Sequence, residues 1–229
     1  MHDWRRHFFS RRVCLKTTWK LRIGVLLLVI LAIASTHKFW TLRIARSLVC
    51  AGDVAPSDVI VVENFDPVYV VFERAAALEK AGVAPRALVP VQGGRDSSVP
   101  SPIFQGIAEV MARQARLDTW DVTPIQQIEP ISLNAATQIR KHLDRERVRS
   151  VLLVTSAFRS RRSSLVYHAV LDDSGIQFRC DPVFGQARPE SWTATWHGIQ
   201  EVTEEFFKLQ YYRFYVLPFV SQRTSRGRE

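Results

Sequence analysis

Two different hydrophobic patterns divide the chain. Near the N-terminus the run IGVLLLVILAIAST, over residues 23–36, carries no charge and has no polar face. Beyond residue 57, short runs rich in Val, Leu and Ile alternate with stretches in which apolar residues recur at helical spacing. The first pattern is typical of a membrane-spanning helix or an export signal. The second is typical of an α/β domain.

The alternating region predicts five strands and five helices. The strands are expected at residues 58–63, 86–92, 123–128, 150–155 and 176–180, and the helices at 66–80, 103–117, 132–145, 159–171 and 192–217. Asp66, followed by Pro67, is the expected N-cap of the first helix, and Ser132 is a candidate cap of the third. Pro90 predicts an edge position or a bend for the second strand.

The strict strand–helix alternation predicts a doubly wound, mostly parallel, five-stranded Rossmann-like sheet, preceded by one transmembrane helix. The expected organisation is a basic head over residues 1–18, an anchor over 19–40, a linker over 41–56, the α/β domain over 57–217 and a polar tail over 218–229. The continuous apolar run SVLLVT at residues 150–155 indicates a strand buried on both faces, as in a parallel sheet.

The flanks of the apolar run favour a retained anchor. Trp19 and Lys20 precede it and Trp40 follows it, so a helix over 19–40 meets the requirement of about 20 residues with aromatic and basic ends. Seven Lys or Arg residues precede the run and three follow it, which predicts a cytoplasmic N-terminus and an external domain. The sequence AIA at residues 32–34 resembles a cleavage site, so a cleaved signal peptide stays the alternative.

The net charge of +9 does not indicate nucleic-acid binding. Residues 1–50 carry ten Lys or Arg and one acidic residue, whereas residues 51–229 carry 21 of each. A neutral domain lacks the basic surface that a phosphate backbone requires. The three cysteines, Cys14, Cys50 and Cys180, form no CxxC pair, so no zinc site is expected. Cys50 and Cys180 both follow the apolar run and can pair if the domain is exported, which their spacing leaves open.

Ligands of doubly wound sheets bind at the carboxyl ends of the strands, so the loops there hold the candidate residues. Glu129 and Asp66 are the candidate catalytic bases. The candidate binding residues are Asn64, Gly93, Gly94, Arg95, Ser132, Asn134, Thr155, Ser156, Arg159 and Arg162. Arg159 and Arg162 share one face at a helix start, a combination that suits phosphate or carboxylate. The structural alternatives are an ion pair of Glu129 with Arg162, a simple turn at residues 93–94 and a solvated arginine face.

Three motifs in these loops resemble a known family. They are the GG pair at residues 93–94, EPISLN at 129–134, and TSAF at 155–158 with Arg162 behind it. In this order they resemble the bacterial YdcF/SanA/ElyC family, over about residues 57–215. The resemblance implies a membrane-anchored domain in cell-envelope or surface-polysaccharide metabolism. The sequence departs from the family at Arg159, where the family has histidine, and at residues 63–67, where it has a glycine-rich turn.

We therefore expect a single-pass protein of the bacterial inner membrane with a periplasmic domain. Its expected partners are the lipid bilayer, through residues 19–40, and an anionic small molecule or lipid-linked glycan precursor held at the strand ends. The alternative is a non-catalytic envelope factor that docks a membrane complex and whose site has decayed, which the departures from the family favour. The sequence identifies no cofactor, no metal ligands and no oligomeric state.

Overall fold

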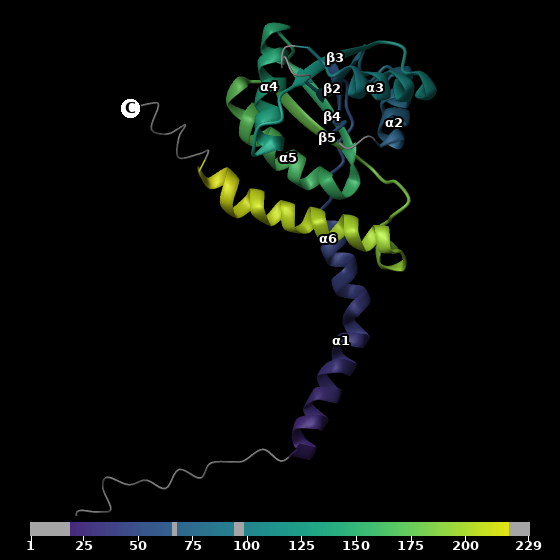
Figure 1. Cartoon of the computed structure of the whole chain (residues 1–229), viewed down its shortest axis with the longest axis vertical. Coiled ribbons are helices and arrows are strands. Elements are labelled where there is room, and N and C mark those ends of the chain that lie inside the picture. The colour runs from purple at the N-terminus through teal and green to yellow at the C-terminus, as the bar shows by residue number, and fades with distance from the viewer. Residues whose placement is uncertain (1–18, 66–67, 94–98, 220–229) are drawn as a thin grey trace, which may run out of the picture. The chain divides into compact units, whose positions relative to one another are not determined.

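The computed structural model describes residues 19–65, 68–93 and 99–219, and divides the chain into two units, residues 1–40 and 41–229. Helix α1, Trp19–Ser47, begins in the first unit (Figure 1). Among the described residues it is the one helix long and apolar enough to cross a membrane, and a signal sequence meets the same criteria. The leucines of its apolar run are exposed, with Leu28 at 68% and Leu31 at 70%, as lipid-facing side chains are.

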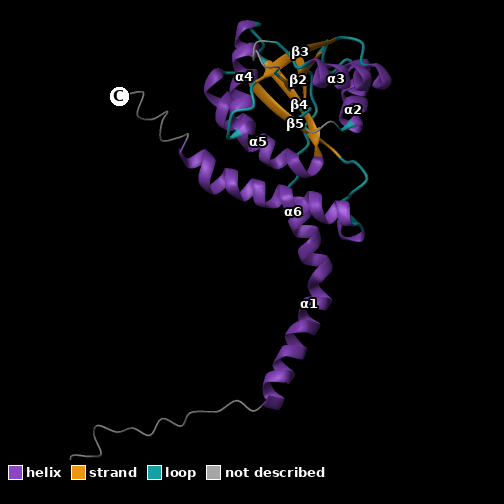
Figure 2. Cartoon of the chain, in the orientation of Figure 1, coloured by secondary structure: helices purple, strands orange, loops and turns teal. Residues whose placement is uncertain are grey.

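The second unit contains a five-stranded, all-parallel sheet, which confirms the predicted fold class. Its strands are β1 Val59–Val62, β2 Ala87–Gln92, β3 Trp120–Ile125, β4 Ser150–Ser156 and β5 Gln177–Val183. Their spatial order is β3-β2-β1-β4-β5. β1 and β4 are buried almost throughout, because both faces of the sheet are covered (Figure 2).

Helices cover the two faces of the sheet in pairs. α2 (Tyr69–Lys80) and α3 (Pro102–Ala115) pack on the face that carries Ile60 and Val62. α4 (Ile131–Arg145) and α5 (Ala157–Leu171) pack on the opposite face, against Val59 and Val61. The chain therefore changes faces between β3 and β4, and the boundary between the two halves lies between β1 and β4.

The last long helix, α6 (Trp196–Tyr211), lies outside α5 rather than on the sheet. Short 3-10 helices at Asp172–Ser174 and Trp192–Ala194 precede it, and a π-helical turn at Tyr212–Val216 continues it. Thr195 is the N-cap residue of α6, and its hydroxyl accepts a hydrogen bond from the N–H of Gly198 at 3.1 Å. The expected helix over 192–217 is thus a series of three helical segments.

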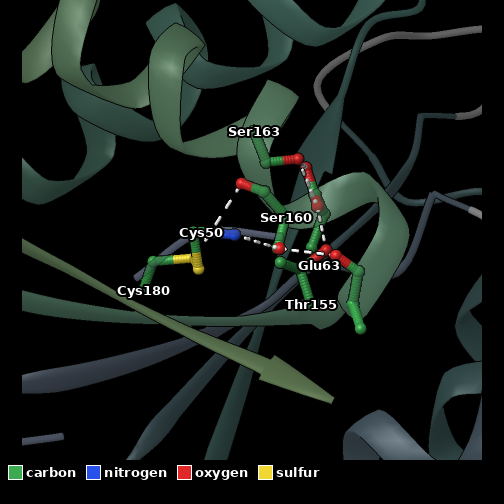
Figure 3. The surroundings of a disulfide bond; sticks show 7 residues. Cys50, Glu63, Thr155, Ser160, Ser163 and Cys180 are labelled. Carbon is green, nitrogen blue, oxygen red and sulfur yellow. Dashed lines mark hydrogen bonds between the residues drawn. A yellow bond between two sulfur atoms is a disulfide. The ribbon is translucent and has the colours of Figure 1, made fainter. Parts of the chain in front are cut away.

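The segment expected to be a linker, 41–56, is partly helical and partly buried. α1 continues to Ser47, and Ala45 and Leu48 are fully buried against α6 and Phe158. Directly after it, Cys50 forms a disulfide with Cys180 of β5, with a Cα–Cα distance of 6.5 Å (Figure 3). The disulfide joins two positions that the sequence could only offer as a possible pair.

Two predictions about the strands need correction. β2 is not an edge strand, since it lies between β1 and β3. The N–H of Ala87 donates to the carbonyl of Thr119, on the side of β3, so by alternation along the strand the nitrogen of Pro90 faces β1. The pairing of β2 with β1 ends at Leu88, so the missing N–H of Pro90 costs no hydrogen bond of the sheet. β3 ends at Ile125, three residues earlier than expected, because the N–H of Gln126 donates to the side chain of Gln138 instead of continuing the ladder.

The expected helix caps are also wrong. α2 begins at Tyr69 with Val68 as its N-cap residue, later than the expected start at Asp66, which lies outside the described residues. α4 begins at Ile131 with Pro130 in the N-cap position, which leaves Ser132 inside the first turn. The side chain of Ser132 is therefore available for a tertiary contact.

Candidate functional site

The candidate site lies where the two halves of the sheet diverge. β1 and β4 are neighbours, but the helices that follow them cover opposite faces, which opens a crevice beyond their carboxyl ends. Glu63 and Asn64 follow β1, while Thr155 and Ser156 end β4 and lead directly into α5. The predicted residues that follow β1 and those that end β4 therefore lie at the same edge of the sheet.

A buried carboxylate, Glu63, follows the end of β1. Glu63 is 4% exposed and accepts hydrogen bonds from Thr155 and from the hydroxyl of Ser163, the latter at 2.7 and 2.9 Å (Figure 3). Burial and the charge of Glu63 raise the pKa of Tyr167 well above its usual value, so its phenol stays protonated. Charge-assisted bonds of this kind hold α5 against β1.

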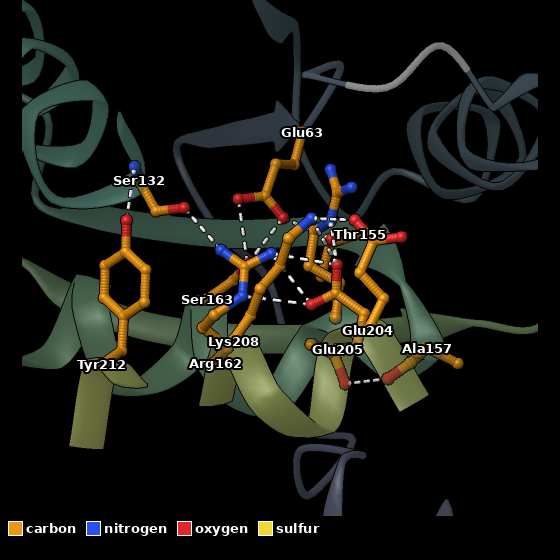
Figure 4. A network of polar contacts seen from close by, with 12 residues as sticks. Glu63, Ser132, Thr155, Ala157, Arg162, Ser163, Glu204, Glu205, Lys208 and Tyr212 are labelled. Carbon is orange, nitrogen blue, oxygen red and sulfur yellow. Dashed lines mark hydrogen bonds and ion pairs between the residues drawn. The ribbon is translucent and has the colours of Figure 1, made fainter. Parts of the chain in front are cut away.

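Arg162 makes an internal ion pair. Its Nη2 and Nε donate to Oε2 of Glu205 at 2.9 and 3.1 Å, and both side chains are buried (Figure 4). Its Nη1 donates to the hydroxyl of Ser132, and its guanidinium lies 5.5 Å from the ring centroid of Tyr212. Tyr212 in turn accepts the N–H of Ser132 at 3.0 Å. The structure thus pairs Arg162 with α6, and not with Glu129.

Beside this network is a cavity of about 320 Å³, which we call the strand-edge pocket. Three cationic side chains, one acidic side chain and three aromatic rings contribute to its wall, which consists of Phe65, Gln127, Glu129, Ile131, Ser132, Arg159, Arg162, Lys208, Tyr211 and Tyr212. Four of the predicted site residues line it together: Glu129, Ser132, Arg159 and Arg162. They come from the loop after β3 and the first turns of α4 and α5.

A second cavity, of about 380 Å³, adjoins the other side of Arg159 and carries three glutamates of α6. Arg159 lines both cavities, and its Nε lies 3.5 Å from Oε1 of Glu205. It therefore lies between the cationic wall of the strand-edge pocket and the acidic wall of the second cavity. Burial, and then the charge of Glu205, raise the pKa of Glu201 in this cavity, while Arg159 and a hydrogen bond with Ser156 oppose the shift. Of the predicted residues, Ser156 belongs to this second cavity.

Other predicted residues build the edge without lining the strand-edge pocket. The side-chain nitrogen of Asn134 donates to the carbonyls of Ile128 and Pro130 at 3.0 and 3.3 Å, so it shapes the loop before α4. The N–H of Gly93 donates to the carbonyl of Ile125 at 2.9 Å, which extends the sheet by one residue. Thr155 holds Glu63, as described above.

Asn64 and Glu129 contribute differently. Asn64 is buried, and its side-chain oxygen has no hydrogen-bond partner among the described residues, so an acceptor is available at the end of β1. Glu129 is exposed, and one of its oxygens accepts the N–H of Ile131 at 3.3 Å. Asp66, Gly94 and Arg95 lie outside the described residues.

The sequence reasoning missed the contribution of α6. Glu205, Lys208, Tyr211 and Tyr212 were assigned only to the last helix, because nothing in their spacing indicates what they face. The position of Glu63 at this edge of the sheet could have been predicted, because it directly follows the apolar run VIVV and so lies at the end of a buried strand.

Within the described ranges, no group of three or more His, Cys, Asp or Glu residues is placed to hold a metal ion. Comparison with protein-family models gives no match, and comparison with curated proteins gives none either.

Proposed function

We propose that this protein is a membrane-anchored, extracytoplasmic binding domain of the bacterial cell envelope. The strand-edge pocket takes an anionic, ring-bearing small molecule or the head group of a lipid-linked glycan precursor. The observation that carries this proposal is the wall of the pocket, in which Arg159, Arg162 and Lys208 meet three aromatic rings in a cavity of about 320 Å³.

The chemistry of that wall suits a sugar bearing a phosphate or carboxylate. Guanidinium groups bind such anions through paired hydrogen bonds, and aromatic faces pack against apolar faces of rings. Glu205 orients the arginines because it ties Arg162 to α6 and approaches Arg159. A positioned cation loses less conformational freedom on binding than a free surface arginine.

The location of the domain has separate support. An N-terminal apolar helix and a disulfide together indicate membrane anchoring or secretion, with the domain outside the cytoplasm. The excess of positive charge before the apolar run supports a cytoplasmic N-terminus and a single pass through the inner membrane. The resemblance of the three loop motifs to the YdcF/SanA/ElyC family supports a role in envelope or surface-polysaccharide metabolism.

The proposal is a binding function, and catalysis would need a base at the pocket. Glu129 is the carboxylate that lines it and is exposed. The alternative, a docking factor without a ligand, is favoured by one observation: the donors of Arg162 are directed to Glu205 and Ser132 rather than to the pocket space.

A thermal-shift panel separates the two. Full-length protein in detergent is heated with sugar phosphates, uronic acids and the matching neutral sugars, alongside Arg159→Ala and the control Arg113→Ala. Arg113 is exposed on α3, away from the pocket. We expect an anionic ligand to stabilise the wild type and the control but not Arg159→Ala. Equal shifts from neutral sugars, or no shift from any anion, would contradict the proposal and support the docking factor.

A further inference from the structure

A separate basic groove lies on the opposite side of α6. It has a volume of about 790 Å³ and draws its wall from four segments: the end of α1 with the residues after it, α5, the loop after β5, and the end of α6 with the π-helical turn. Its lining residues are Arg46, Ser47, Val49, Cys50, Ala51, Arg161, Leu165, Phe184, Pro189, Leu209, Gln210 and Arg213. Three arginines and no acidic side chain line it.

The charges of the groove are only partly balanced by neighbouring groups. Arg46 pairs with Glu190 at 3.5 Å, and both side chains are more than 60% exposed, so water screens that pair. Arg161 and Arg213 are exposed, and each comes from a different helix. Leu165, Phe184 and Leu209 line the groove as well and are less exposed than the three arginines, so they form an apolar floor. A cationic rim above an apolar floor suits an amphiphile with an anionic head.

The walls of the groove are fixed to one another. The N–H of Arg161 donates to the carbonyl of Leu48 at 2.9 Å, and the N–H of Cys50 donates to the hydroxyl of Ser160 at 2.9 Å (Figure 3). The disulfide to Cys180 ties the same segment to β5. The segment that carries Arg46 is therefore held against α5.

The surface of α6 next to the groove is aromatic and exposed. Trp196, Phe207 and Phe214 are 72%, 67% and 70% exposed. Trp196 and Phe207 both lie in α6, and their separation of eleven residues places them roughly 20° apart around a helix of 3.6 residues per turn. Phe214 lies in the π-helical turn that follows. On the same wheel, Gln210 of the groove lies about 60° from Phe207. The guanidinium of Arg213 lies 5.7 Å from the ring centroid of Phe214. Exposed aromatic residues beside arginines are typical of surfaces that contact lipid head groups.

Chain connectivity keeps Arg46 of the groove close to the apolar run. Arg46 follows the end of the apolar run at Thr36 by ten residues, so even a fully extended chain holds it within about 35 Å of the run. We propose that the groove binds the phosphate of an anionic membrane lipid, with Arg46, Arg161 and Arg213 around the phosphate. The exposed rings of Trp196, Phe207 and Phe214 would then lie in the head-group layer. The site is distinct from the strand-edge pocket and goes beyond the function proposed above.

The test measures lipid binding to the full-length chain in neutral detergent by native mass spectrometry. Phosphatidylglycerol is titrated against zwitterionic phosphatidylcholine, on the wild type and on Arg161→Ala/Arg213→Ala. The matched control is Arg113→Ala/Lys141→Ala, which removes the same charge from exposed positions on α3 and α4. Each basic residue contributes roughly fivefold to binding of anionic lipid, so we expect a loss of about 25-fold in the groove variant and no more than about twofold in the control.

Four outcomes would overturn the proposal. The first is equal binding of the two lipids, and the second is equal loss in the groove and control variants. The third is displacement of the lipid by an equimolar amount of glycerol 3-phosphate, which would identify a soluble phosphate as the ligand. Arg159→Ala distinguishes the two sites, since it should abolish ligand stabilisation at the strand-edge pocket and leave phosphatidylglycerol binding intact. The fourth outcome that would overturn the proposal is loss of lipid binding in Arg159→Ala alone, which would assign the lipid to the strand-edge pocket.

Discussion

The internal pair of Arg162 and Glu205 gives the sharpest prediction about the candidate site. Glu205→Gln keeps the shape of the side chain and removes its charge, which leaves a buried guanidinium without its main counterion. The two side chains are only 6% and 7% exposed, so water cannot replace the carboxylate. Removing one partner of a buried pair destabilises proteins by about 3–5 kcal/mol.

Two features of the structure place the effect at the lower end of that range. The hydroxyl of Ser132 and the ring of Tyr212 still contact the guanidinium, and a glutamine oxygen can accept one of the bonds now made by Glu205. We therefore expect a loss of about 3 kcal/mol in the free energy of unfolding. For a domain of this size that corresponds to a fall of about 6–12 °C in melting temperature.

The assay is thermal unfolding of the full-length protein in detergent, followed by tryptophan fluorescence. The matched control is Glu204→Gln, one residue away on α6, whose side chain is 53% exposed and pairs with Lys208. That pair is exposed, so the control should lose no more than about 1 kcal/mol. The double variant Arg162→Met/Glu205→Leu should recover most of the stability, because apolar side chains replace buried pairs well. A loss below about 1 kcal/mol in Glu205→Gln would refute the reasoning and imply that Arg162 does not depend on α6.

Two further predictions concern the disulfide and the acidic cavity. Cys50→Ser/Cys180→Ser should lower the free energy of unfolding by about 2–5 kcal/mol, because the bond closes a loop with a sequence separation of 130 residues; a chemical-unfolding midpoint equal to that of the wild type would contradict this. Glu201→Gln should stabilise the protein at neutral pH. The raised pKa of Glu201 means that folding penalises its charged form, so stability is lost as the pH rises from its unfolded-state value through its folded-state value. Melting temperatures of variant and wild type should therefore converge at acidic pH and diverge toward pH 7, and a difference independent of pH would contradict this account.

The sheet was predictable because its signals are local. Strands such as β1 and β4 are continuous apolar runs between turns, and their alternation with helices leaves a parallel sheet as the simple solution. The same reasoning placed Glu129, Ser132, Arg159 and Arg162 at one edge, and the structure brings all four to the strand-edge pocket.

The contacts of α6 were not predictable, because they depend on where a peripheral helix packs. The amphipathic pattern of α6 indicates a buried face but not its partner, so Glu205 gave no sign that it neutralises Arg162. Likewise, Ala45 and Leu48 follow the apolar run among basic residues and read as a linker, although both are buried against other elements. The disulfide was not predictable either, because sequence spacing does not determine the distance between Cys50 and Cys180.

The most direct test of the central claim is to identify what the strand-edge pocket holds in the cell. Full-length protein is extracted gently, and the masses of its bound species are compared by native mass spectrometry between the wild type, Arg159→Ala and the control Arg113→Ala. We expect an anionic species, such as a sugar phosphate or lipid-linked sugar, on the wild type and the control and its loss from Arg159→Ala. A ligand-free wild type, or a species that Arg159→Ala retains in full, would contradict the claim that this pocket binds an anion.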